Sequence, residues 1–386
     1  MSFFYKIVLI SLLILVAGNV QGQQGSIKKF SVSGYVKDLQ ILQFSKDMDP
    51  VFDNLIHQRA NFRYDPLSQL SFGLDIRSRI YFGDSPGNPF FGDLLDFDPG
   101  IVDMSWLLVD KENWVFSLQI DRAWIDWTDK KWSVRAGRQR INWGINLYWN
   151  TNDLFNTNNI ADFDYEELPG SDALRIQRHF KKMRSIEFAI EPSRDPDKWR
   201  AAILYKFNKK GYDFQTLLSW WNTDLAIGGG WAGNIRNAGF KGEMTYFIPR
   251  DGIDFKNDAL SLSVSSDYFF KNSMYLTGGF MFNSTGTTET LISEEGLFFA
   301  SSSAKNLMPT KYNFLINAAY PATPLIGVSA LLIYAPGTEL IYFIPSFSYS
   351  ISQNWEFSMF FQTYWAEVDR VENLGNAFVL RFKMNY

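Results

Sequence analysis

The last nine residues alternate between apolar and mostly polar side chains, and the chain ends on an aromatic residue. Side chains in a β-strand point alternately to its two faces, so this segment predicts a strand with one apolar face. A lipid-facing apolar row is typical of the closing strand of an outer-membrane β-barrel, through which we expect the barrel assembly machinery to receive the chain. The row consists of Phe378, Leu380, Phe382, Met384 and Tyr386.

Similar apolar runs of period two, bounded by turn residues, recur from residue 28 to the end of the chain. They predict an all-β protein, a transmembrane antiparallel β-barrel of about 18 strands. Sixteen is the alternative, because residues 224–237 contain three consecutive glycines that could mark a bulge or a missed turn. The expected strands are 28–44, 54–65, 68–83, 113–128, 131–143, 173–180, 183–192, 198–208, 211–222, 224–234, 238–248, 258–270, 273–284, 311–320, 324–334, 338–351, 354–367 and 375–386.

The connections between these strands alternate between short turns and long loops. Outer-membrane barrels have short periplasmic turns and long outer loops, so this alternation supports the barrel independently of the apolar pattern. It also predicts periplasmic termini and an even number of strands. The long connections are 84–112, 144–172, 285–310 and 368–374.

The N-terminus has the build of a cleaved secretory signal. Lys6 precedes an apolar run over residues 7–17, and Val20-Gln21-Gly22 forms a small-residue exit. We therefore expect a signal peptide over residues 1–22 and a single barrel over residues 23–386, placed in the outer membrane of a Gram-negative cell in contact with its lipid.

Composition excludes several other classes of protein. The chain has no cysteine, which excludes disulfides and cysteine-based metal sites. Aromatic residues make up 17% of the chain although its mean hydropathy is −0.15, and after Ala17 no apolar stretch is long enough for a membrane helix. With 37 basic and 41 acidic residues, net charge gives no reason to expect a nucleic-acid partner. A soluble β-sandwich is the alternative fold, but it would not expose so many outward aromatics.

Eleven of the 17 arginines lie between residues 59 and 184, and strand parity directs most of them into the lumen. A charge facing lipid near the bilayer midplane costs about 2–4 kcal/mol, whereas a wall of inward guanidinium groups attracts anions. The alternative is that each arginine pairs with an inward carboxylate such as Asp75, Asp121 or Glu187, and both can be true. The expected inward residues are Arg59, Arg63, Arg77, Arg79, Arg135, Arg175, Gln177 and His179.

The strand expected over residues 131–143 departs from this parity. Arg138 and Arg140 share the parity of the apolar Trp132 rather than that of Arg135. Either Gly137 marks a bulge that resets the register, or the two arginines lie above the lipid band. We include Arg138, Gln139 and Arg140 among the residues expected to line the pore.

The connection 144–172 joins the strands of Arg135 and Arg175 and is rich in asparagine and acidic residues. We expect it to fold inward and narrow the pore, because opposite charges attract more strongly near a protein surface than in bulk water. A solvated outer loop or a calcium site would use the same residue types, but no spacing is diagnostic and we predict no metal or cofactor. The expected constriction residues are Asp153, Asp162, Asp164 and Glu166.

Three segments of this region resemble the strand-loop-strand signature of the alginate-export family of outer-membrane barrels and related porin-like families. They are Trp132 to Gly144 (WSVRAGRQRINWG), Asn152 to Asn156 (NDLFN) and Asp172 to Arg175 (DALR). The resemblance implies an 18-stranded barrel with an arginine-lined, loop-gated lumen and an acidic saccharide as solute. Its motif touches Gly137, Arg138, Gln139 and Arg175.

We therefore expect a passive channel for small or anionic solutes, acidic saccharides among them. The alternative is a structural or partner-binding barrel without transport activity. A barrel phospholipase would need a serine and histidine pair on its outer wall, and the only histidines, His57 and His179, are expected to face inward. We do not expect an enzyme.

Overall fold

The computed structural model describes residues 29–46, 48–156, 167, 170–250, 257–289, 303–367 and 370–386. Within these residues no helix has the length and apolar character needed to cross a membrane. The signal peptide expected over residues 1–22 lies outside the described residues and stays a prediction.

The described residues form 19 strands, one short α-helix and two 3-10 turns; all the strands except β4 overlap an expected strand. The strands are β1 Phe30–Ser45, β2 Met48–Leu67, β3 Leu70–Gly83, β4 Ser105–Lys111, β5 Trp114–Thr128, β6 Trp132–Gln139, β7 Ser171–Phe180, β8 Arg184–Glu191, β9 Arg200–Lys209, β10 Tyr212–Trp221, β11 Asp224–Ile235, β12 Ala238–Pro249, β13 Ala259–Phe269, β14 Tyr275–Asn283, β15 Tyr312–Thr323, β16 Ile326–Ala335, β17 Leu340–Ser350, β18 Trp355–Glu367 and β19 Val371–Asn385. The turns and helix are η1 Ser85–Gly87, α2 Phe91–Asp96 and η2 Pro196–Lys198.

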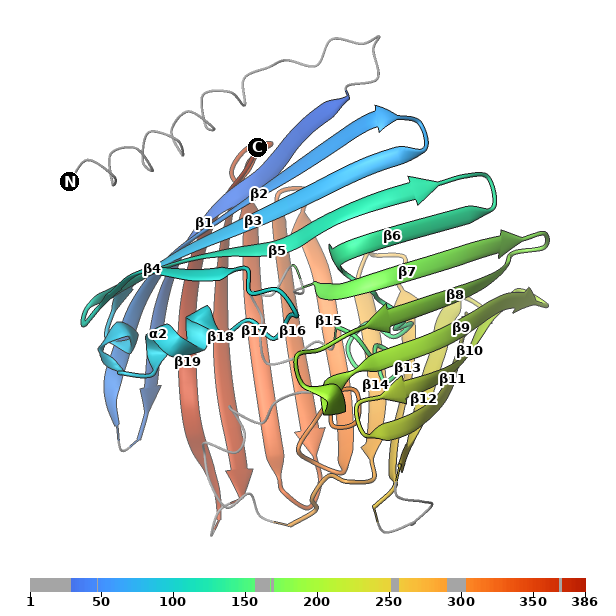
Figure 1. Cartoon of the computed structure of the whole chain (residues 1–386). Coiled ribbons are helices and arrows are strands. Elements are labelled where there is room, and N and C mark those ends of the chain that lie inside the picture. Colours follow the sequence, from blue (N-terminus) through green and yellow to red (C-terminus); the bar gives the residue numbers. More distant parts are fainter. Residues whose placement is uncertain are drawn as a thin grey trace.

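Eighteen of these strands close into one antiparallel barrel, which confirms the expected fold class and strand number (Figure 1). The ring closes because β1 pairs with β2 on one edge and with β19 on the other. The register of β11 runs without interruption through its three glycines on both edges, so the stretch that left 16 strands open contains neither a bulge nor a turn.

Two connections differ from expectation. The one before β19 is short, since β18 ends at Glu367 and β19 begins at Val371. The connection after β3 is not a simple outer loop, because it contains η1, α2 and β4. β4 pairs with residues 114–119 of β5, whereas β6 pairs with residues 123–128 on the same edge. A run as short as SWLLVDK has too little alternation to predict this wall segment from sequence.

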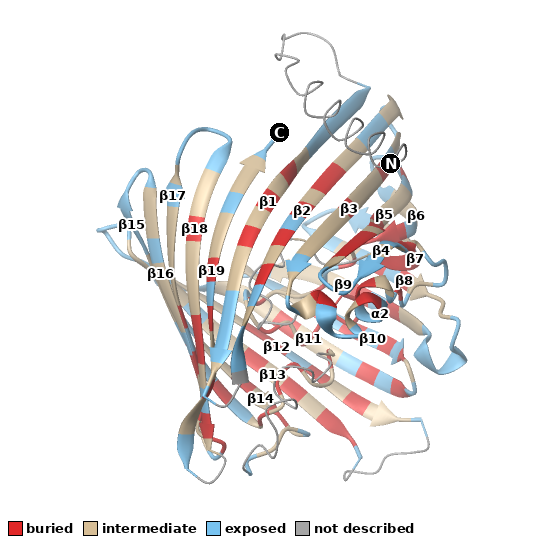
Figure 2. Ribbon diagram, turned by 90° about the vertical axis from the view of Figure 1, so that its left-hand side faces the viewer, coloured by how far each residue is buried: buried red, intermediate tan, exposed pale blue. Residues whose placement is uncertain are grey.

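Side chains sort by parity onto the two faces of the wall. On β2 and β3 the exposed Phe52, Ile56 and Phe82 alternate with buried Arg59 and Arg77. Buried positions gather in the middle of β1 and β2 (Figure 2). The apolar row therefore faces lipid and the polar row faces the lumen, as the cost of a charge in lipid requires.

The terminal residue completes the ring over a glycine of β1. The backbone groups of Gly34 and Tyr386 exchange two hydrogen bonds of 3.0 Å, and the Tyr386 hydroxyl donates to the carbonyl of Arg59 at 2.9 Å. A Cβ at position 34 would lie 2.1 Å from that carbonyl and 2.7 Å from the hydroxyl, so only glycine fits.

We predict that Gly34→Leu destabilises the closed barrel by about 1–3 kcal/mol through this overlap and lowers the folded fraction in heat-modifiable gel migration. Gly278→Leu is the matched control, because nothing lies within 4 Å of a Cβ at that position. Equal folded fractions for the two variants would contradict the account of closure.

Candidate functional site

The inward arginines of β2 and β3 are held in buried ion pairs. Arg59 bridges Asp75, at 3.0 Å, and Asp121, and its side chain is 1% exposed. Arg77 contacts the other oxygen of Asp121 at 2.9 Å and the amide oxygen of Gln119 at 2.6 Å. We call these linked ion pairs the ladder. They correspond to the alternative considered from the sequence, in which each arginine pairs with an inward carboxylate. Because Arg59 and Arg77 are buried and neutralised, they brace the wall and are withdrawn from any solute path.

The next inward arginines are paired but partly open to the lumen. Arg135 lies 2.7 Å from Asp126, and Arg175 lies 2.7 Å from Glu187, with about a quarter of each arginine side chain exposed. Arg63 is more exposed and pairs with Asp65 at 2.9 Å. Arg79 donates to the carbonyl of Leu95 in α2 at 3.4 Å, which holds that helix against the wall.

Arg138 is enclosed and does not line the pore. It contacts Asp98 at 2.6 Å and Asp172 at 2.7 Å, and it is 3% exposed. The register of β6 is continuous on both edges, so Gly137, although its φ is +108°, does not reset the parity. Arg138 therefore keeps its outward direction, and the segment around Asp98 covers it.

Three of the four remaining expected pore residues, Gln139, Gln177 and His179, have different surroundings. Gln139 is fully buried and donates to the carbonyl of Ala173 at 2.9 Å, so it fixes the end of β6 and does not line the pore. Gln177 follows Arg175 on the inward face of β7 and lies beside Glu187 of β8. His179 lines a cavity of about 450 Å³ together with Lys206, Asp213 and Ile145.

Arg140 lies in a basic recess on the lumen side of β2, β3, β5 and β6. This cavity of about 310 Å³ is lined by four arginines, Arg63, Arg122, Arg135 and Arg140, and by two carboxylates, Asp75 and Glu167. Arg122 binds Glu167 at 2.6 Å and lies 3.7 Å from Asp75. Arg140 makes no side-chain hydrogen bond or ion pair with the described residues, and its charge acts on the nearby Asp153.

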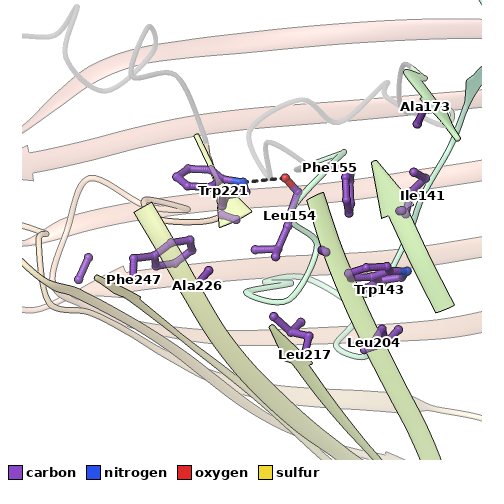
Figure 3. Packing of buried hydrophobic residues seen from close by; sticks show 14 residues of the cluster. Ile141, Trp143, Leu154, Phe155, Ala173, Leu204, Leu217, Trp221, Ala226 and Phe247 are labelled. Atoms are coloured by element: carbon purple, nitrogen blue, oxygen red, sulfur yellow. Dashed lines mark hydrogen bonds between the residues drawn. The ribbon is translucent and has the colours of Figure 1, made fainter. Parts of the chain in front are cut away.

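Beyond β6 the chain enters the lumen and lies along the wall from β7 to β13. Ile141, Trp143, Leu154 and Phe155 pack with inward residues of these strands in one apolar cluster (Figure 3). The indole of Trp221 donates to the carbonyl of Leu154 at 2.8 Å, as the dashed line in Figure 3 shows. We call residues 140–156 the inner loop. Its position agrees with the expected inward fold.

A carboxylate of the wall anchors the described part of the inner loop. Glu243 of β12 accepts hydrogen bonds from the backbone amides of Ile145, Asn146 at 2.5 Å and Asn152 at 3.0 Å. Further along the same connection, Glu167 binds Arg122 of the wall at 2.6 Å. Asp162, Asp164 and Glu166 lie outside the described residues, so their expected contacts with the arginines stay a prediction.

The three glycines of β11 provide the surface on which the inner loop lies. The side-chain amide of Asn152 donates to the carbonyl of Gly229 at 3.0 Å. A Cβ on Gly228 would lie 2.8 Å from Asn152, and one on Gly230 would lie 2.9 Å from Ile145. The sequence signal for this contact was the glycine run itself, since glycine in a strand often marks a close backbone approach.

Asp153 is the one expected constriction residue among the described residues, and it is buried within the inner loop at 2% exposure. Burial raises the pKa of Asp153 to about 8, although Arg140 opposes the shift. An exposed aspartate titrates near 3.9. The raised pKa means that the folded state favours the protonated form of Asp153. The contribution of Asp153 to the stability of the inward loop is therefore complete below about pH 4 and decreases as the pH rises towards 8.

A second loop fills the lumen near β14 to β19 and was not expected from sequence. Ala304, Leu307 and Met308 are buried, and Leu307 and Met308 join Trp149 of the inner loop in an apolar cluster with inward residues of these strands. Asn283 binds this loop through the carbonyl of Met308 at 2.9 Å. Residues 303–310 thus share the lumen with the inner loop.

We predict that Asp121→Ala lowers the free energy of unfolding by about 3–5 kcal/mol, because it leaves Arg59 and Arg77 buried without their shared carboxylate. The matched change Asp65→Ala removes a partner of the exposed Arg63 and should cost at most about 1 kcal/mol. Denaturant unfolding in lipid vesicles measures both values. Similar losses for the two variants would show that the ladder does not brace the wall.

Comparison with known proteins supports the fold. No family model matches the chain, and no curated protein matches it. Among solved structures, Acinetobacter baumannii OccAB2 has a TM-score of 0.59 at 10% identity and covers 94% of this chain and 99% of its own. OccK11 of Pseudomonas aeruginosa has 0.57 at 9%, covering 94% and 98%. An OprD structure from the same organism has 0.58 at 9%, covering 94% and 96%. The likeness extends over the whole barrel, while the resemblance to the alginate-export family stays a prediction.

Proposed function

We propose that this protein is an outer-membrane channel for small solutes and that its lumen favours anions, acidic saccharides among them. The closed 18-strand barrel, its lipid-facing apolar row and its likeness in fold to the outer membrane protein OprD support this role. The proposal includes export through a cleaved signal peptide over residues 1–22, insertion through the C-terminal strand β19, and residence in the Gram-negative outer membrane.

The basic recess is the observation that carries the anion preference. Among the described residues its lining has four arginines and two carboxylates. Arg63 and Arg135 also pair with Asp65 and Asp126, so Arg140 is the lining arginine that makes no ion pair with the described residues. Charges of one sign in a confined, low-dielectric space concentrate ions of the opposite sign. Arg59, Arg77 and Arg138 add little to this field because each is buried against carboxylates.

The inner loop is the proposed constriction. It spans the lumen from the end of β6 to β12 and β13, where Asn146 donates to the hydroxyl of Ser263 at 2.6 Å. Leu147 is 55% exposed, so part of this loop faces open space rather than the wall. A solute would therefore pass between the inner loop and the arginine side of the barrel.

A structural barrel without transport is the second candidate. It is favoured by the apolar clusters of the two loops, which fill the lumen against β9 to β12 and β14 to β19. Single-channel recording in planar bilayers separates the two candidates, since a filled lumen conducts no ions.

We predict that Arg140→Ser lowers the permeability of anions relative to cations, because it removes a positive charge of the recess that makes no ion pair with the described residues. The measurement is the reversal potential in a salt gradient. Arg178→Ser is the matched control: its guanidinium stacks on the rings of Trp132 and Phe180 at 4.9 and 5.0 Å, on the outward face. A reversal potential that shifts equally in both variants, or in neither, would contradict the role of the recess.

We predict that Gly228→Val raises single-channel conductance, because its side chain displaces Asn152 and lifts the inner loop from β11. Gly375→Val serves as the control, since no atom lies within 4 Å of a Cβ there. Size exclusion of neutral sugars should loosen in parallel. If the conductance of Gly228→Val stays at the wild-type level, the inner loop does not limit the pore.

A further inference from the structure

The wall of the barrel contains a step beside β5. The half of β5 nearest the long loops pairs with β4 and the other half pairs with β6. β6 and β8 have only eight residues each, whereas a tilted transmembrane strand needs about 9–11. The loop-side ends of β6 and β8 therefore fall short of a full span of the hydrocarbon core, next to the point where β4 replaces β6.

Polar groups exposed by this step are satisfied by side chains. Arg138 donates to the carbonyls of Ile120, at 3.2 Å, and Val102, at 2.7 Å. Asp98 accepts from the amide of Met104 at 2.9 Å, and Asp172 accepts from the amide of Val102 at 3.2 Å. An unpaired backbone group in lipid costs several kcal/mol, so this cluster lets a break in the wall face the membrane.

An apolar pocket of about 410 Å³ lies against this cluster. Its walls come from β5 to β8, the segment 101–104 and the chain before β9. Leu174 and Trp199 line it and are 38% and 42% exposed. Leu174 alternates with the inward Arg175, which places the pocket on the lipid-facing side. The two charged lining residues, Arg138 and Asp172, bind each other and so offer little to a polar ligand.

We propose that this pocket binds one acyl chain of a lipid from the membrane leaflet on the side of the long loops. The pocket is continuous with the lipid-facing row, since Phe188 and Ile203 beside it are 38% and 44% exposed. A water molecule needs polar partners, and an apolar cavity does not hold it well. Hydrocarbon is the material that the barrel meets at this depth, and it matches the pocket chemically.

The bound chain would complete the wall at the step. It covers Ile101 and Val102, which are 42% and 51% exposed, and it shields the ion pairs of Arg138 from headgroups and water. An acyl chain in the bilayer is already in hydrocarbon, so its retention in the pocket depends on van der Waals packing. A chain enclosed by pocket walls makes more such contacts than lipid on a flat strand face and exchanges more slowly. This inference concerns the outer surface and does not depend on transport through the lumen.

Photolabelling tests the proposal. The full-length protein is reconstituted with a phospholipid that carries a diazirine on its acyl chain, irradiated and mapped by peptide mass spectrometry. We expect labelling of residues 101–104 and 172–174 above that of the lipid-facing residues of β16. Ala123→Trp fills the pocket from its β5 wall and should reduce this labelling to the β16 level. Ala330→Trp, on the lipid-facing row of β16 beside exposed Val328 and Leu332, should leave it unchanged.

Heat-modifiable migration identifies folded protein before labelling. Leu174→Trp fills the same pocket from β7 and replaces Ala123→Trp if that variant does not fold. Uniform labelling of the wild-type barrel overturns the proposal, because it shows ordinary lipid contact only. Labelling that persists in a folded filling variant overturns it as well, since the label would then come from outside the pocket.

Discussion

Every backbone group in the wall must find a hydrogen-bond partner within the protein, because lipid offers none. Closure of β1 against β19 meets this requirement around the ring. The same requirement explains the step in the wall where β4 takes over from β6 and Arg138, Asp98 and Asp172 bind the exposed backbone. Arg138 points outward and is nevertheless stable, since its charge is enclosed by two carboxylates and two carbonyls.

Some arginines inside the barrel are buried in ion pairs that stabilise the wall, and others stay partly exposed to the lumen. Burying an ion requires a close partner, and Asp121 provides it for Arg59 and Arg77 together. Arginines nearer the open lumen keep part of their surface exposed, and Arg140 makes no ion pair with the described residues. The proposed anion preference therefore rests on this second group. An inward arginine therefore supports a solute path only where no carboxylate of the protein neutralises it.

The lumen is shaped by contacts between segments far apart in the chain. Glu243 holds the amides of Ile145 and Asn152, which lie about a hundred residues earlier, and the glycines of β11 give the inner loop a surface without side chains. Residues 303–310 pack on the other side. The width of any passage is thus set by two loops whose positions depend on the finished wall.

The strands and their inward faces follow from local rules, so the sequence alone determined the approximate bounds of most strands and the lumen-facing parity of Arg59, Arg77 and Arg175, while it left the strand number open between 18 and 16. The alternation of apolar and polar residues and the turn residues depend only on neighbours in the sequence. The cost of placing a charge in lipid applies to each residue separately. Tertiary structure alone decided that Arg138 is covered by residue 98, that residues 105–111 complete the wall, and that Glu243 anchors the inner loop. Each of these depends on a partner that becomes a neighbour only when the sheet curves and closes, so no local pattern records it.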